Sequence, residues 1–110
     1  TGVQTCALPI CGEAVLAGRA AIVARLAAVT AAPAAAGLRR IVRHNVANVR
    51  FTNVTRESAE VSSYFTVFTE IGLDHYGRYR DVFVPVAGDW LIAHRLAATD
   101  WSAENSTMVG

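Results

Sequence analysis

The sequence predicts an α+β fold in which one helix precedes an antiparallel sheet of about four long strands. Two observations carry this prediction. An alanine-rich segment with apolar residues at three- and four-residue steps comes first, and this spacing favours an amphipathic helix. Runs rich in β-branched and aromatic residues follow, separated by short turn signals, and they favour strands joined as a meander.

The composition is that of a globular domain. The chain has 110 residues, which fits one domain, with 53% hydrophobic residues, 17% charged residues and a net charge of +1. This charge gives no electrostatic reason to expect a nucleic acid or an anionic membrane as partner. No apolar run reaches the roughly 18 residues that span a bilayer, and no secretory signal is recognisable. We therefore expect a cytoplasmic protein.

No pattern indicates a metal or a cofactor. Cys6 and Cys11 are the only cysteines, and no second pair completes a zinc site. The three histidines are scattered along the chain, and neither a glycine-rich phosphate loop nor a G-x-S-x-G elbow occurs. We predict no metal site and no cofactor.

We expect both ends of the chain to lie outside the folded domain. Residues 1–10, TGVQTCALPI, resemble the translation of a sequencing adaptor, and the chain has no initiator Met. We therefore expect residues 1–10 to be non-native, residues 11–101 to form a domain that is truncated at its N-terminus, and residues 102–110 to form a flexible polar tail.

The predicted helix runs from Gly18 to Ala32. Arg19 and Arg25 lie on its polar side, and Pro33 ends it because proline lacks an N–H and clashes with the preceding turn. A linker of small residues follows, as far as Gly37.

Four strands are predicted after the linker. They span Leu38–Thr52, Ser58–Ile71, Gly77–Val86 and Asp89–Thr99, with turns at 53–57, 72–76 and 87–89. Alternation places His44 and Asn48 on one face of the first strand. The second strand carries apolar residues on both faces. A single helix is little cover for such a sheet, which is a second reason to expect a missing N-terminal element.

A set of short motifs, taken together in this order, resembles a known family. The motifs are Gly18-Arg19-x-x-Ile22, His44-x-x-x-Asn48, Ala59-x-x-x-x-Tyr64, Gly77-x-Tyr79-x-Asp81-x-Phe83 and Gly88-x-Trp90-x-Ile92-x-x-Arg95. They resemble the SnoaL-like branch of the nuclear transport factor 2-like superfamily.

The resemblance implies a cone-shaped fold, here incomplete, in which a strongly curved antiparallel sheet wraps around helices and encloses a pocket. Some members of this superfamily are dehydratases, isomerases or polyketide cyclases. Others, such as the small subunits of ring-hydroxylating dioxygenases, bind or assemble without chemistry. Both an enzyme and a non-catalytic module therefore remain open.

His44 is the main candidate for catalysis, because an imidazole titrates near neutral pH and because His44 matches the position of a catalytic His in scytalone dehydratase-like relatives. Asp81 is a second candidate, with a role in orienting His44 or the substrate. The candidate substrate-binding residues are Asn48, Tyr64, Tyr79 and Arg95. The expected substrate is a small apolar or aromatic molecule, handled without a cofactor.

Structural roles compete with each of these assignments. Asp81 and Arg95 lie on adjacent predicted strands and are expected to form a salt bridge. Trp90 is expected in the core, His75 in a solvated turn beside Asp74, and His94 on the apolar side of the last strand. The two apolar faces of the sheet also fit a homodimer formed through the sheet.

Overall fold

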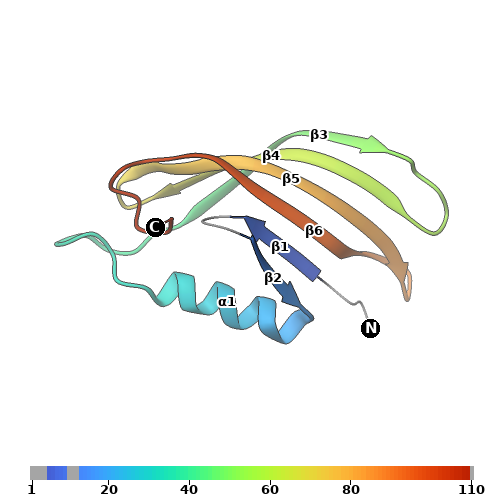
Figure 1. Cartoon of the computed structure of the whole chain (residues 1–110), viewed down its shortest axis with the longest axis horizontal. Helices are drawn as coiled ribbons and strands as arrows, with labels where there is room; N and C mark the ends of the chain where they lie inside the picture. The colour runs from blue at the N-terminus through green and yellow to red at the C-terminus, as the bar shows by residue number, and fades with distance from the viewer. Residues whose placement is uncertain (1–4, 10–12, 110) are drawn as a thin grey trace.

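The computed structural model describes residues 5–9 and 13–109, which form one helix and a curved six-stranded sheet. The elements are β1 (Thr5–Pro9), β2 (Glu13–Ala17), α1 (Arg19–Ala31), β3 (Arg43–Thr52), β4 (Ala59–Thr69), β5 (Gly72–Val86) and β6 (Asp89–Ser102). The strand order is β2-β1-β6-β5-β4-β3, and every neighbouring pair is antiparallel except β1 with β6. Figure 1 shows β3–β6 as one curved layer, with α1 beneath its concave side.

The predicted α+β class and curved antiparallel sheet are confirmed. The helix ends at Ala31, and Ala32 is extended, as expected of a residue before proline. The strand bounds differ most at the starts of two strands, and the last strand runs to Ser102 instead of ending at Thr99. The first long strand begins only at Arg43, and the predicted turn at 72–76 is wrong, because β5 already begins at Gly72. Gly72 follows the chain reversal with a φ of 95°, a conformation that favours glycine.

Two short strands at the N-terminus were not predicted. The strand β1 (Thr5–Pro9) pairs with both β2 and β6, so it extends the sheet beyond the four long strands. It lies within the segment that we expect to be non-native, and that expectation stays a prediction. Residues 1–4 and 10–12, including Cys11, lie outside the described residues.

The strand β4 defines two faces of the sheet. Its buried residues alternate with exposed or half-buried ones along its whole length. Val61, Phe65 and Val67 are buried on the face that we call inner, whereas Tyr64 and Phe68 are exposed on the opposite, outer face. This alternation confirms that apolar residues occupy both faces of the strand.

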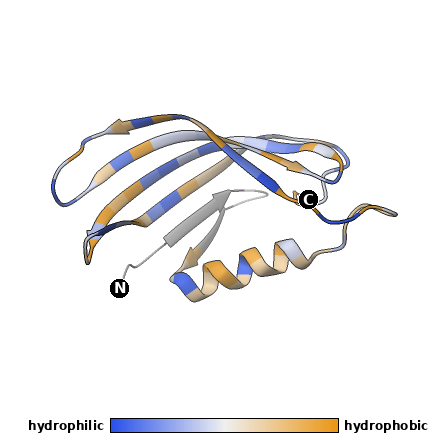
Figure 2. Ribbon diagram, turned by 180° about the vertical axis from the view of Figure 1, so that it is seen from behind, coloured by the Kyte–Doolittle hydropathy of each residue, from blue (hydrophilic) through white to orange (hydrophobic). Residues whose placement is uncertain are grey.

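The helix α1 leaves the inner face largely open. It lies on the concave side (Figure 2) but contacts only β1 and β2 among the described elements. Val23 and Leu26 are 57% and 58% exposed, and no residue of α1 is buried. No helix in the described part of the chain is both long and apolar enough to cross a membrane.

Bulges interrupt the strand ladders and change which side chains share a face. One lies in β3 between Ala47 and Arg50. A second leaves Asp74 as an extra residue in β5, because Val67 pairs with His75 and Phe68 pairs with Leu73. A third leaves Ala93 as an extra residue in β6. Each bulge corrects an expectation that rested on strict alternation.

The C-terminal segment (residues 103–109) returns to the turn that joins β4 and β5. The Ala103 amide donates to the Asp74 carbonyl at 2.8 Å. The hydroxyl of Ser106 and the amide of Thr107 donate to the Asp74 carboxylate at 2.6 and 3.0 Å. This segment was expected to be a flexible tail. It is polar and lacks periodicity because its partners are polar groups of the turn rather than a hydrophobic core.

Candidate functional site

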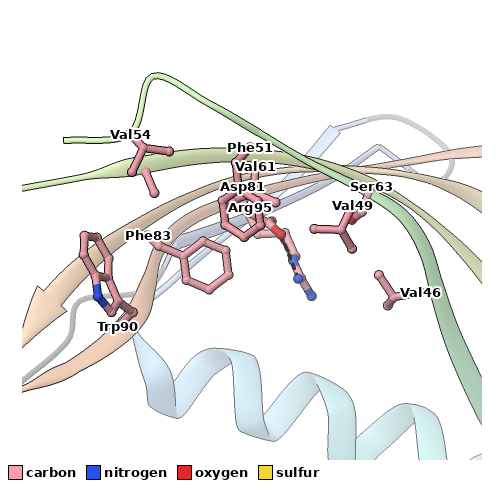
Figure 3. A pocket seen from close by; sticks show the side chains of 11 residues that line it. Val46, Val49, Phe51, Val54, Val61, Ser63, Asp81, Phe83, Trp90 and Arg95 are labelled. Atoms are coloured by element: carbon pink, nitrogen blue, oxygen red, sulfur yellow. Dashed lines mark hydrogen bonds and ion pairs between the residues drawn. The ribbon is translucent and has the colours of Figure 1, made fainter.

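A cavity of about 570 Å³ lies on the inner face of the sheet. The side chains that surround it point from the sheet toward α1 (Figure 3). Most are apolar, and the polar ones are Ser63, Asp81 and Arg95. The cavity is lined by Val46, Val49, Phe51, Val54, Ala59, Val61, Ser63, Asp81, Phe83, Trp90 and Arg95. An apolar wall with a few polar groups is typical of sites for small organic molecules.

Asp81 and Arg95 are the charged residues of the cavity wall. They are register partners on β5 and β6. Arg95 donates from Nε to Oδ1 at 2.8 Å and from Nη2 to Oδ2 at 2.9 Å, a bidentate geometry. The predicted salt bridge is confirmed, and it fixes a guanidinium group beside an apolar cavity.

A row of rings continues from Arg95 along the inner face. The Arg95 Cζ atom lies 3.8 Å from the centroid of the Tyr79 ring. Tyr79 stacks on Phe65 with ring centroids 4.5 Å apart, and Phe65 meets the edge of His75 at 5.9 Å. Tyr79, a predicted substrate-binding residue, therefore lies on the face that bears the cavity.

Gly77 makes room for this row. It lies between His75 and Tyr79 on the inner side of β5 and pairs with Phe65. A Cβ atom at this position would lie 1.9 Å from the Ala98 carbonyl oxygen and 2.8 Å from Phe65 Cζ. Only glycine lets the Phe65 ring lie over this strand.

His44 lies on the inner face of β3, two residues before Val46. It pairs with Val67, which in turn pairs with His75, so the two histidines lie in one row across three strands. Loss of solvation lowers the pKa of His44 below its ordinary value of 6.5, and the charges of His75 and Arg95 lower it further. His44 is therefore neutral at pH 7 and able to accept a proton. It borders the cavity-lining residues without lining the cavity itself.

Asp74 and His75 are the residues that the sequence analysis missed. We expected His75 to be solvated in a turn, but it is 8% exposed and Asp74 is 0% exposed. The bulge at Asp74 turns both side chains inward, and His75 Nδ1 lies 2.7 Å from Asp74 Oδ1. The adjacent Asp and His were visible in the sequence, but their burial depends on the bulge.

Asn48 and Tyr64 lie away from the cavity, which corrects their expected placement. Asn48 adopts a φ of 54° within the β3 bulge, so it no longer shares a face with His44. It borders an outer groove together with Tyr64 and Arg78. Tyr64 is 55% exposed there.

Trp90 and His94 also differ from expectation. Trp90 is 47% exposed and lines the cavity instead of filling a core. Ala93, the extra residue of β6, interrupts the alternation that would place His94 on the same face as Trp90. His94 is exposed and borders an outer groove with Arg80 and Leu96.

Among the residues that the structure describes, no group of three or more His, Cys, Asp or Glu side chains is arranged to hold a metal ion. The site as described consists of an apolar cavity, an ion pair and two histidines that lie in one row across three strands.

The fold is similar to that of several solved structures. A protein provisionally classed as a scytalone dehydratase from Novosphingobium aromaticivorans aligns with a TM-score of 0.74 and 20% identity, over 99% of this chain and 72% of that one. The β subunit of a provisionally classed aromatic-ring-hydroxylating dioxygenase from the same organism aligns with a TM-score of 0.66 and 15% identity, over 98% and 74% of the two chains. A protein of unknown function with a cystatin-like fold from Nostoc punctiforme aligns with a TM-score of 0.68 and 18% identity, over 94% and 71%.

At these identities the structural matches establish the fold alone. No curated protein has a sequence significantly similar to that of this chain. The sequence model of the SnoaL-like domain matches residues 5–96, which is most of the chain. The order of motifs from Gly18 to Arg95 lies within this match, and the curved sheet with its inner cavity agrees with it. The chain therefore belongs to the SnoaL-like domain family.

Proposed function

We propose that this chain binds a small apolar or aromatic molecule on the inner face of its sheet and transfers protons on it without a cofactor. One observation carries the proposal. The imidazole of His44, neutral at pH 7, lies on the same face as an apolar cavity of about 570 Å³, two residues before the lining residue Val46 on β3.

In this proposal His44 is the proton acceptor. A neutral imidazole takes a proton from a carbon atom next to a carbonyl group, and the electron pair moves to the carbonyl oxygen as an enolate forms. The protonated ring then returns the proton to carbon or to a departing hydroxyl group. Isomerisation, cyclisation and dehydration all begin with this step.

Arg95 is the proposed partner of the enolate. Positive charge placed before the reaction stabilises the oxygen on which negative charge develops, and an apolar cavity strengthens the effect. Asp81 keeps the guanidinium in place through its bidentate bonds. We therefore assign Asp81 the role of orienting Arg95, and Tyr79 the role of a platform beneath it.

Deuterium exchange tests the proposal without knowledge of the natural substrate. The probe is 2-tetralone, a small aromatic ketone, in D₂O, with incorporation of deuterium next to the carbonyl followed by NMR. The protein should accelerate exchange by about a hundredfold over free imidazole at the same concentration. His44→Gln should abolish the acceleration, while Tyr64→Phe on the outer face should retain it. Equal acceleration by the parent and His44→Gln removes His44 from the mechanism.

A non-catalytic assembly module is the second candidate, and the outer face favours it. Tyr76 and Trp101 stack there with centroids 5.4 Å apart. The large exposed side chains of this face are Tyr64, Phe68, Leu73, Tyr76, Leu96 and Trp101. We propose that a second copy of the chain covers them, since an apolar sheet face of this kind fits an interface.

Light scattering tests this second proposal. The parent should have the mass of a dimer, and the double variant Tyr64→Lys, Trp101→Lys should have the mass of a monomer. A parent that remains monomeric across the accessible concentration range contradicts the dimer.

A further inference from the structure

The carboxylate of Asp74 is completely buried and is hydrogen-bonded to four groups. Its Oδ1 atom lies 2.7 Å from His75 Nδ1 and accepts from the Ser106 hydroxyl at 2.6 Å. Its Oδ2 atom accepts from the Thr69 hydroxyl at 3.2 Å and from the Thr107 amide at 3.0 Å. Such a set of donors satisfies a buried charge that would otherwise be costly.

These bonds determine which nitrogen of His75 carries a proton. Burial alone raises the pKa of Asp74, but the hydrogen bonds from Ser106, His75 and Thr107 outweigh it, and the pKa lies below its ordinary value. Asp74 is therefore an ionised carboxylate, which only accepts hydrogen bonds. His75 Nδ1 must then be the donor, and whenever the ring is neutral its Nε2 is the basic nitrogen.

The C-terminal segment supplies two of the four donors. The Ser106 oxygen accepts hydrogen bonds from the amides of Met108 and Val109 at 3.2 and 2.9 Å, so its own hydrogen is directed to Asp74. The Ala103 amide holds the start of the segment on the Asp74 carbonyl at 2.8 Å. The segment thus encloses the carboxylate and the His75 bond together.

A second network anchors the same segment. The Thr107 hydroxyl donates to Glu70 at 2.9 Å, and Arg40 donates to Glu70 at 2.9 Å and to the Val29 carbonyl of α1 at 3.1 Å. The segment is therefore fixed to the helix and to the β4–β5 turn at positions that do not involve Asp74.

We propose that Asp74 is a positioning residue for His75, and that the C-terminal segment holds His75 in the Nδ1–H form by binding the same carboxylate. The segment would then be part of the inner-face site, because His75 lies in one row with His44 on that face. Any effect on proton transfer rests on the proposed function, whereas the proton position on His75 does not.

NMR of the imidazole groups in the full-length protein tests the proposal. Long-range ¹H–¹⁵N spectra at about pH 8.5, where an imidazole is neutral, report the tautomer of each ring. The parent should contain His75 in the Nδ1–H form alone. Asp74→Asn should give a mixture of both tautomers, because an amide both donates and accepts.

Solvent exchange of the His75 Nδ1 proton tests the role of the segment. Ser106→Ala should accelerate this exchange about tenfold, because one charge-assisted bond that closes the segment is lost. Glu104→Ala, an exposed change in the same segment, should match the parent. If Asp74→Asn does not fold, the exchange rate of the His75 Nδ1 proton in Ser106→Ala tests the proposal by itself.

Two results overturn the proposal: an Nε2–H tautomer in the parent, or identical exchange rates in Ser106→Ala and Glu104→Ala. Neither depends on a substrate. A protein that holds His75 as proposed but does not exchange deuterium into 2-tetralone would refute the proposed function and leave this inference intact.

Discussion

Asp81 and Arg95 join β5 to β6 through two parallel hydrogen bonds, of 2.8 and 2.9 Å, at the wall of the inner cavity. The Asp81 side chain is 3% exposed and that of Arg95 is 29% exposed, so the carboxylate is withdrawn from water and the Arg95 side chain is only partly buried. The pair therefore combines two roles. It satisfies a buried charge, and it presents a fixed cation to whatever occupies the cavity.

We predict a large coupling between these two residues in a double-mutant cycle. Asp81→Ala, Arg95→Ala and the double variant should give a coupling of about 2 kcal/mol in the free energy of unfolding, measured in urea. Either single change leaves a charge that the fold has partly buried, which is why the coupling is large.

The pair of Arg78 and Asp100 is the matched control, because it bridges the same two strands with side chains that are 54% and 38% exposed. Its coupling should be only about 0.5 kcal/mol. Equal couplings in the two cycles would mean that burial of Asp81 adds nothing.

Gly77→Ala should destabilise the protein by about 3 kcal/mol, since the new Cβ atom meets backbone as well as the Phe65 ring. Gly72→Ala is the comparison, because nothing lies within 4 Å of its Cβ position and only its φ of 95° is unfavourable. That change should cost about 1 kcal/mol. Urea denaturation of both variants checks the difference, and a milder effect at Gly77 than at Gly72 contradicts it.

The sequence was sufficient to predict the helix, the four long strands and the Asp81–Arg95 pair, because these depend on local patterns and on one hairpin. It was insufficient wherever a bulge changed the alternation. One extra residue in β3 moves Asn48 off the face that bears His44. One extra residue in β5 leaves Asp74 and His75 buried together. No residue type in these stretches marks a bulge as clearly as a proline marks the end of a helix.

The sequence pattern also could not predict the hydrogen bonds that hold the C-terminal segment on Asp74. Ser106 and Thr107 lie more than 30 residues from Asp74 along the chain, as the separations of 32 and 33 show. A polar segment without periodicity predicts a loose tail, whereas the hydrogen bonds of this segment to Asp74 and Glu70 depend on the fold of the rest of the chain.

His44 should make the stability of the protein depend on pH near neutrality. Its pKa is lower in the folded protein than the ordinary value of 6.5, so the unfolded chain binds a proton more readily. The free energy of unfolding should therefore fall as the pH drops below about 6.5, until the pH passes below the pKa of the folded state.

Urea denaturation between about pH 8 and pH 5 should show a smaller fall for His44→Gln than for the parent. Asp74 contributes in a separate, more acidic range. Its lowered pKa stabilises the fold above the ordinary value of 3.8, and this contribution is lost as the pH falls through the value of the folded state. Identical pH dependence in parent and His44→Gln above pH 5 would contradict the assignment to His44.

Binding of the fluorescent probe 1-anilinonaphthalene-8-sulfonate should distinguish the two faces of the sheet. Trp90 and Tyr64 are matched in exposure, at 47% and 55%, but Trp90 lines the inner cavity and Tyr64 lies on the outer face. Trp90→Ala should weaken binding about tenfold, because it removes a large aromatic wall. Tyr64→Ala should leave the affinity unchanged.

Fluorescence titration of the parent and both variants measures these affinities. Arg95→Gln adds a third comparison, since the sulfonate carries a negative charge and the cavity holds the Arg95 guanidinium. This variant should weaken binding while leaving the apolar wall in place. Loss of affinity in Tyr64→Ala, with Trp90→Ala unaffected, would place the apolar binding surface on the outer face and favour the assembly module over the cavity.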